Sequence, residues 1–158
     1  MEKLPARKQN RLKKFDYGQN GAYFITVCTA NRDKILWCHR RGGYYPPAQV
    51  PLSYVGRIVQ QSLLQVKNHY PNVSVDKYCI MPDHVHFILT IQPDENGRIL
   101  SAPTVPTVVG SMKRWVSRQI GEPIWQKSYY DHVIRNQDDY DEVWQYIENN
   151  PLKYALTN

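Results

Sequence analysis

The sequence contains few cysteines and no Cys-x-x-Cys pair. Its three cysteines, Cys28, Cys38 and Cys79, are widely spaced and odd in number, which argues against a disulfide framework and against a cysteine-based zinc site. Long apolar runs are also missing: the first residues contain no apolar core segment, and no later stretch is apolar over a length that could span a bilayer. We therefore expect no membrane segment, reduced thiols and a cytoplasmic location.

Internal repeats and low-complexity tracts are absent as well, and the 158 residues fit one domain, 1–158. The net charge is +6, and residues 1–16 form a basic arm whose first 14 residues hold six Lys and Arg side chains and one Glu. Such an arm either solubilises the chain or binds a polyanion such as a nucleic-acid backbone. The arm residues that would contact phosphate are Arg7, Lys8, Arg11, Lys13 and Lys14.

The hydrophobic pattern predicts four strands and three helices. Alternating apolar residues indicate strands over 21–32, 73–82, 84–91 and 123–135, and apolar residues at i, i+3, i+4 and i+7 indicate helices over 52–70, 104–120 and 136–150. Ser53 is a plausible N-cap of the first helix, and Gly121 ends the second. The order is typical of an α+β protein with a ferredoxin-like split β-α-β antiparallel sheet, to which the C-terminal helix is an addition.

The segment MPDHVHFIL, residues 81–89, places two histidines in a strand that otherwise reads as buried. Because side chains alternate along a strand, His84 and His86 share one face with Ile88, whereas Val85 and Phe87 share the other. Two imidazoles on one face can converge on a single divalent ion. At this level a metal-binding pair and two half-exposed strand histidines are equally good interpretations.

The last helix is the place to look for chemistry, because the first two helices are expected to cover the apolar face of the histidine strand. Tyr146 and Asn150 lie one turn apart on the last helix, at the edge of its apolar stripe. A phenol and an amide beside two imidazoles offer a nucleophile and a third metal ligand. Tyr146 could instead be a packing residue, and Tyr129 and Tyr130 in the preceding strand are alternative nucleophiles.

Three motifs occur in order along the chain: MPDHVHFIL, WQKSYYDHVIR at residues 125–135, and YIENNP at residues 146–151. Together they resemble the IS200/IS605-like transposases, specifically the REP-associated tyrosine transposase branch of the HUH (Y1) single-strand nucleases. The resemblance extends from RLKKFDYGQNGAYFITVCTANR, residues 11–32, to the C-terminus, which is nearly the whole chain.

This resemblance implies a metal-dependent DNA nuclease and transposase. By it, His84 and His86 bind Mg²⁺ or Mn²⁺, Asn150 matches the third, helix-borne ligand, and Tyr146 is the nucleophile that takes the 5′ phosphate and frees a 3′-OH. The implied partner is single-stranded or hairpin DNA, the protein acts as a monomer or a homodimer, and its location is nucleoid-associated. Further candidate DNA contacts, each of which could equally be an ordinary solvated side chain, are Lys113, Arg114 and Lys153.

Other functions fit the sequence less well or remain open. A histidine-triad hydrolase would need a third histidine where the chain has Ile88, and a two-His-x-Thr phosphoesterase would need a second such motif, which the sequence lacks. A ferredoxin-like RNA-binding module would need exposed aromatic residues on the histidine face of strand 84–91, and the sequence offers none there. A domesticated, non-catalytic protein of the same fold that binds hairpin DNA or RNA is compatible with every residue, and His132 has no assigned role.

Overall fold

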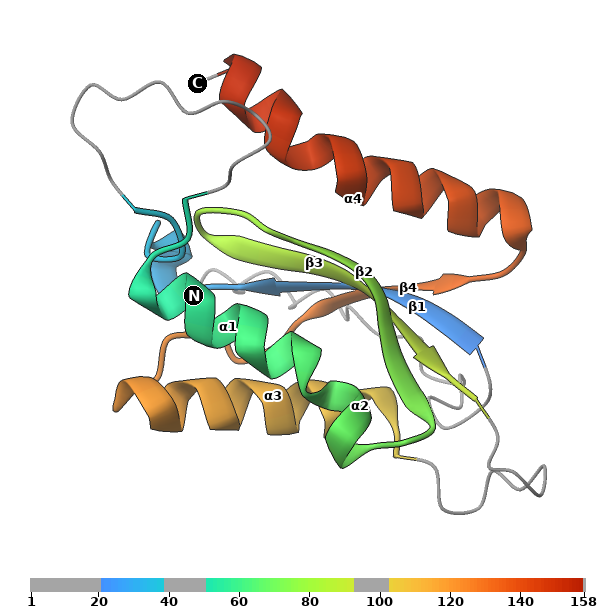
Figure 1. The fold of residues 1–158 in the computed structure, drawn as a ribbon, viewed down its shortest axis with the longest axis horizontal. Coiled ribbons are helices and arrows are strands. Elements are labelled where there is room, and N and C mark those ends of the chain that lie inside the picture. Colours follow the sequence, from blue (N-terminus) through green and yellow to red (C-terminus); the bar gives the residue numbers. More distant parts are fainter. Residues whose placement is uncertain (1–20, 39–50, 93–102, 158) are drawn as a thin grey trace, which may run out of the picture.

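The computed structural model describes residues 21–38, 51–92 and 103–157, which form a four-stranded antiparallel sheet with helices on both faces (Figure 1). The strand order is β2-β3-β1-β4. The strands are β1 (Gly21–Cys28), β2 (Val73–Ile80), β3 (His84–Ile91) and β4 (Tyr130–Ile134), the helices are α1 (Tyr54–Leu64), α2 (Val66–His69), α3 (Val105–Ile120) and α4 (Gln137–Thr157), and the 3-10 turn η1 (Ala30–Arg32) follows β1. The predicted ferredoxin-like fold class, with an added C-terminal helix, is confirmed.

Local signals in the sequence fix three helix ends. The Ser53 hydroxyl caps α1 by accepting a hydrogen bond from the Gly56 amide at 3.0 Å, as predicted. Thr104 caps α3 in the same way by accepting from the amide of Thr107 at 3.3 Å. Gly121 ends α3 in the left-handed conformation, with φ of 91°, where glycine carries no steric penalty.

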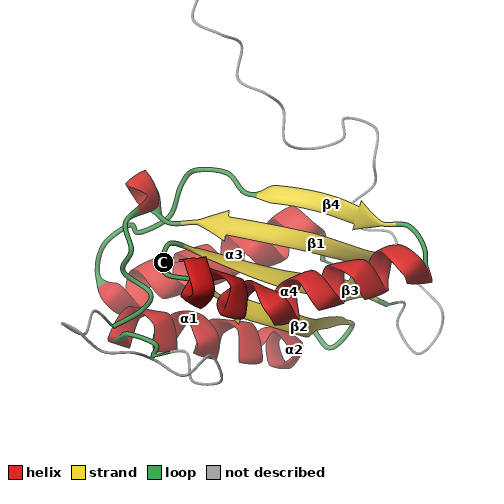
Figure 2. Cartoon of the chain, turned by 90° about the horizontal axis from the view of Figure 1, so that it is seen from above, coloured by secondary structure: helices red, strands yellow, loops and turns green. Residues whose placement is uncertain are grey.

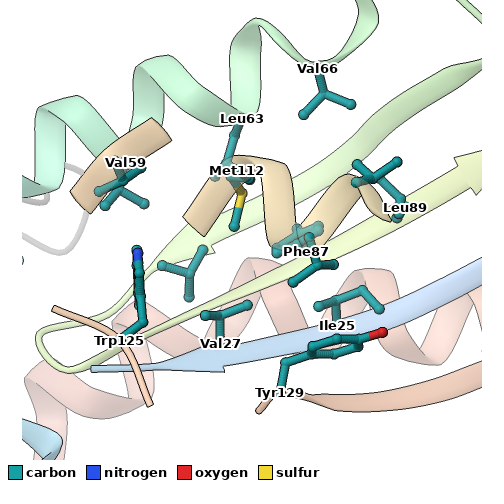
Figure 3. Packing of buried hydrophobic residues seen from close by; sticks show 14 of the residues in the cluster. Ile25, Val27, Val59, Leu63, Val66, Phe87, Leu89, Met112, Trp125 and Tyr129 are labelled. Atoms are coloured by element: carbon teal, nitrogen blue, oxygen red, sulfur yellow. The ribbon is translucent and has the colours of Figure 1, made fainter. Parts of the chain in front are cut away.

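The larger hydrophobic core lies between the sheet and the helices α1, α2 and α3 (Figure 3). On the sheet side, Ile25 and Val27 of β1 lie beside Phe87 and Leu89 of β3, and all four are almost fully buried. On the helix side, α1 contributes Val59 and Leu63, and α3 contributes Met112. This core covers the apolar face that the alternation in β3 predicted.

The opposite face of the sheet is covered by α4, which lies over β2 and β3 (Figure 2). A second, smaller hydrophobic cluster joins them, made of Cys79, Met81, Ile88, Val143 and Ile147. The histidine face of β3 is therefore the face beneath the last helix, as the sequence led us to expect. Among the helices of the described ranges, none combines the length and the apolar character needed to cross a membrane.

The strand expected over 123–135 is shorter than predicted, because β4 spans only Tyr130–Ile134. Ahead of it, Trp125 makes an isolated antiparallel bridge to Thr29. The ammonium of Lys113 donates hydrogen bonds to the carbonyl oxygens of Gln126, at 2.6 Å, and Ser128, at 3.3 Å. A helix side chain thus satisfies backbone groups that a longer strand would have paired with a neighbour.

The last helix is longer than predicted, since α4 continues through Pro151 to Thr157. Proline removes one backbone donor from a helix interior, but the helix continues beyond it, and Tyr154 contacts Trp37 with ring centroids 5.3 Å apart. Lys153, which was expected beyond the helix end, therefore lies inside α4, and its side chain is outside the described part of the chain.

Candidate active site

His84 and His86 point their Nε2 atoms at each other. The two atoms are 3.1 Å apart, and the ring centroids are 4.6 Å apart at an interplanar angle of 72°. Both side chains lie on the α4 face of β3, and His86 is largely buried, at 7% exposure. The two predicted site histidines are thus brought together as a convergent pair.

The Nδ1 atoms of the same rings face away from the pair and are held by other side chains. His84 Nδ1 lies 2.6 Å from a carboxylate oxygen of Asp83, and His86 Nδ1 lies 2.8 Å from the hydroxyl of Thr26. A carboxylate only accepts, so His84 carries its proton on Nδ1 and presents a lone pair at Nε2. A hydroxyl donates or accepts, so Thr26 can serve either tautomer of His86.

This arrangement fits a divalent cation. In the tautomer of His86 that is protonated at Nδ1, two lone pairs face each other at 3.1 Å, and they repel unless a cation lies between them. Adjacent ligands of an octahedral Mg²⁺ or similar ion are separated by about 3.0 Å, given bond lengths of 2.0–2.1 Å. Outer partners such as Asp83 and Thr26 are the usual means by which proteins orient metal-binding imidazoles.

The electrostatics keep both imidazoles neutral, which is the form that coordinates a metal. Burial lowers the pKa of His86 to about 3, and the charge that His84 would carry if protonated and the charge of Arg32 act in the same direction. Burial also lowers the pKa of His84, although its hydrogen bond to Asp83 opposes the shift. Burial disfavours the charged form of Asp83, but the hydrogen bond from His84 and the nearby positive charges outweigh it, so the pKa of Asp83 lies below its usual value.

Tyr146 lies beside this pair and remains accessible. Its ring packs edge-on against His86, with centroids 5.4 Å apart, and against Phe24 of β1, with centroids 5.8 Å apart. The side chain is 46% exposed, whereas its neighbour Ile147 is fully buried beneath α4. The helix therefore inserts Ile147 into the small cluster and leaves the Tyr146 phenol at the rim, next to the histidines.

Asn150 contacts β2, the strand next to the histidine strand β3. Its side chain hydrogen-bonds to the buried thiol of Cys79, whose pKa burial raises to about 12. Cys79 is the β2 residue directly opposite His86. This contact lowers the thiol pKa, but burial outweighs it, and the amide oxygen is the atom through which Asn150 would bind a metal ion. In the described residues no group of three or more His, Cys, Asp and Glu side chains could hold a metal ion, so a third ligand drawn from these residues would be of another type.

Of the other predicted site residues, Tyr130 shares the histidine face, because it pairs with Thr26, which contacts His86, whereas the rest lie elsewhere or outside the described chain. Lys113 and Arg114 belong to α3, on the opposite face of the sheet (Figure 1), and Lys113 bonds to backbone carbonyls there. Tyr129 is 3% exposed within the larger core, so it does not face the histidines. Tyr130 is 51% exposed on β4, where it pairs with Thr26. The predicted contacts of the basic arm lie outside the described residues: Arg7, Lys8, Arg11, Lys13 and Lys14.

Four residues of the site environment were not singled out from the sequence. Asp83 and Thr26 orient the imidazoles, and Phe24 packs against Tyr146. Asp139 accepts a hydrogen bond from His132 at 2.8 Å, which gives that histidine a structural partner at the start of α4. Asp83 could have been found, because it directly precedes His84. Thr26 and Phe24 become neighbours of the site only through the pairing of β1 with β3.

Known proteins with a similar sequence and fold exist. No family model matches the chain. The chain is 31% identical to an uncharacterized protein of Haemophilus influenzae over an alignment of 166 positions, which covers 92% of this chain and 88% of the relative. It is 24% identical to the REP-associated tyrosine transposase of Escherichia coli K12, over 88% of this chain and 71% of that protein.

The fold comparison agrees. A solved structure described as the REP-associated tyrosine transposase bound to a REP hairpin superposes with a TM-score of 0.63, covering 93% of this chain and 74% of that one at 22% identity. Sequence similarity along most of the chain to proteins named REP-associated tyrosine transposase, together with the shared sheet and helices, confirms the resemblance to that family.

Proposed function

We propose that the protein is a transposase-type endonuclease and strand transferase that cleaves and rejoins single-stranded DNA beside REP-like hairpins through a 5′-phosphotyrosine intermediate. The observation that carries the proposal is the contact between Tyr146 and His86, with ring centroids 5.4 Å apart on a face where the phenol is 46% exposed. A nucleophile and a convergent imidazole pair come from separate elements and meet at one accessible point. Similarity to the REP-associated tyrosine transposases and the hairpin-bound structural neighbour support the same proposal.

Each residue has a defined role in this proposal. His84 and His86 hold Mg²⁺ or Mn²⁺ through Nε2, with the Asn150 oxygen as the third protein ligand. When bound, such an ion polarises the scissile phosphate and stabilises the charge that develops during its displacement. Asp83 and Thr26 fix the orientation of the two rings, and Phe24 supports the Tyr146 ring at the edge of the helix.

The reaction itself is a phosphoryl transfer to tyrosine. The Tyr146 oxygen forms a bond to phosphorus, the bond from phosphorus to the 3′ oxygen breaks, and the proton lost by the phenol is balanced by the one gained by the leaving 3′-OH. The covalent intermediate keeps a phosphodiester, so attack by another 3′-OH reverses the step and joins strands without an external energy source.

The partner follows from the chemistry of the site and from the relatives. The structural neighbour was solved with a REP hairpin, and we propose hairpin DNA with a single-stranded flank as the substrate here. With one nucleophilic tyrosine in each site, strand exchange proceeds either by successive reactions of a monomer or by a homodimer. Such an enzyme works where DNA is accessible, so we propose a cytoplasmic, nucleoid-associated location.

The test is formation of a covalent adduct. Purified protein is incubated with Mg²⁺ or Mn²⁺ and a labelled pool of hairpin DNAs carrying single-stranded flanks, and adducts that resist denaturing detergent are resolved by electrophoresis. We expect an adduct with the unaltered protein and none with Tyr146→Phe, which removes one oxygen and keeps the ring that packs on His86 and Phe24. Tyr130→Phe and Tyr54→Phe are matched controls, since both side chains are exposed, and they should form the adduct.

The possible results separate the candidate functions. Loss of the adduct in Tyr146→Phe with unchanged hairpin binding supports the nuclease, as does loss in His84→Ala and His86→Ala. Hairpin binding by the unaltered protein without an adduct under any metal condition would instead favour the domesticated, non-catalytic alternative. An equal adduct yield in Tyr146→Phe would refute the assignment of the nucleophile.

A further inference from the structure

Arg32 sits beside the histidine pair in an unusual backbone conformation. It ends the turn η1, and both Asn31 and Arg32 have left-handed φ angles, 55° and 57°. Asparagine adopts this region comparatively readily, but a long side chain such as arginine is uncommon there. Strained positions of this kind persist where the surrounding structure enforces them, and they concentrate at functional sites.

The turn is fixed to the site by Thr29, which is fully buried. The Thr29 amide and hydroxyl both donate to the carbonyl oxygen of Asp83, each at 3.0 Å. The single hydrogen of that hydroxyl is shared with the carbonyl of Asp33, at 2.8 Å. The turn that carries Arg32 and the Asp83–His84 step therefore form one rigid unit, and the guanidinium keeps a set position relative to His84.

The guanidinium and the first metal-site histidine share one carboxylate. Arg32 donates from Nε to one oxygen of Asp83 at 3.0 Å, and His84 occupies the other oxygen at 2.6 Å. Arg32 also donates from one terminal nitrogen to the sulfur of Cys28 at 2.9 Å. These contacts occupy two of the five N–H bonds of the guanidinium within the described part of the chain, and the side chain is still 51% exposed.

A stabilising ion pair alone explains this arrangement poorly. An exposed ion pair contributes little to stability, and it does not require its arginine to take a strained backbone. A guanidinium held through Nε and one terminal nitrogen, whose second terminal nitrogen has no hydrogen bond among the described residues and lies beside a site for a phosphodiester, can still bind a phosphate.

We propose that Arg32 binds a backbone phosphate of the DNA strand next to the scissile linkage, an inference that rests on the proposed function. The contact is independent of base sequence and positions the strand over the histidine pair, as phosphate contacts generally do. The guanidinium also offsets the charge of Asp83, which would otherwise repel the approaching strand. Arg32 is thus a substrate-positioning residue, and its ligand is a phosphodiester anion.

The first arm of the test is the salt dependence of binding. In a Tyr146→Phe background without metal, the affinity for a hairpin with a single-stranded flank is measured over a range of salt concentrations. Loss of one phosphate contact on a single strand lowers the slope of log affinity against log salt by about 0.7. We expect this drop for Arg32→Gln and none for Arg57→Gln, which removes the same charge from an exposed site on α1, across the sheet.

The second arm locates the phosphate. Single linkages on either side of the scissile position are replaced by neutral methylphosphonates, and binding by Arg32→Gln and the arginine form is compared for each. At one flanking linkage we expect the effects of the substitution and of the neutral linkage to be non-additive, because they remove the same contact. Arg32→Lys keeps the charge without the planar fork, and should retain the slope while losing affinity.

The results separate this inference from the proposed function. The inference is overturned if Arg32→Gln and Arg57→Gln give the same slope, or if every flanking methylphosphonate acts additively with the substitution. If Arg32→Gln does not fold, Arg32→Lys takes its place. The salt slopes of Arg32→Lys and of the arginine form are then compared on each methylphosphonate substrate, and the same criteria apply. Adduct formation through Tyr146 is scored separately. An adduct without any effect of the Arg32 substitutions on binding refutes the phosphate contact alone. An effect of these substitutions on binding without an adduct refutes the nuclease alone.

Discussion

Ile147→Ala tests how the last helix holds the nucleophile in place. Ile147 is fully buried in the small cluster under α4 and directly follows Tyr146. Val143 is the other cluster residue that α4 contributes. The side chain that anchors the helix and the one that performs the proposed chemistry are therefore adjacent, and loosening the first should displace the second.

The size of the effect follows from the groups removed. Ile147→Ala deletes three carbon atoms, worth about 2.4 kcal/mol at roughly 0.8 kcal/mol each. The cavity left behind adds to this, so a total of about 3 kcal/mol lies within the range for such core substitutions. Because α4 is the last element and packs on the face away from the larger core, we expect the loss to appear as local release of α4. A change of that size raises the released population roughly a hundredfold.

Native-state hydrogen exchange measures this release directly. Amides of α4 should lose about two orders of magnitude of protection in Ile147→Ala, while those of α1 and α3 change little, and adduct formation should fall. Glu148→Ala is the control, since Glu148 is half-exposed and its pair with Lys77, at 3.6 Å, is worth less than about 1 kcal/mol. Equal loss of protection in α1, α3 and α4 would refute local release, and unchanged α4 protection would refute the anchoring role of Ile147.

Two further predictions concern packing and thiol chemistry. Gly56→Ala would place a methyl group 2.1 Å from the carbonyl oxygen of Leu36, so we expect the unfolding free energy to fall by about 3 kcal/mol. Gly110→Ala meets only the flexible end of an arginine side chain, so its unfolding free energy should rise by up to about 1 kcal/mol. Denaturant unfolding of both variants measures these changes, and equal effects would contradict the prediction. Burial raises the pKa of Cys79 to about 12, so its reactive thiolate is scarce at pH 8 and appears only as the pH rises toward that value. A thiol reagent should therefore modify exposed Cys38 far faster than Cys79. An undiminished fast phase in Cys38→Ser would contradict the assignment of that phase to Cys38.

The features that could be predicted from the sequence depend on short-range geometry. Alternation along β3 placed His84 and His86 on one face and Val85 on the other, because the side-chain period of a strand is fixed. Ser53 and Gly121 were identified as helix ends because capping needs only neighbouring residues. The position of Tyr146 beside the buried stripe of the last helix followed from helical periodicity in the same way.

The features that could not be predicted depend on contacts between distant residues. The strand expected over 123–135 is shorter, and Lys113, from another helix, bonds to carbonyls in the segment that precedes it. Helix α4 continues past Pro151, and Tyr154 contacts Trp37, more than a hundred residues away in the chain. Local signals at Pro151 favoured an earlier end, and nothing near it in sequence shows the later contact.

By itself, the sequence determined the order of elements, the face on which the histidines lie and the helix that covers them, since each follows from the periodicity of a strand or a helix. Only the tertiary structure decided which groups surround the site: Thr26 holds His86 because β1 pairs with β3, and Arg32 shares Asp83 with His84 because a buried threonine ties the turn after β1 to that step. The physical reason is that periodicity sets the direction of a side chain, whereas its partners depend on strand pairing and packing between residues far apart in the chain.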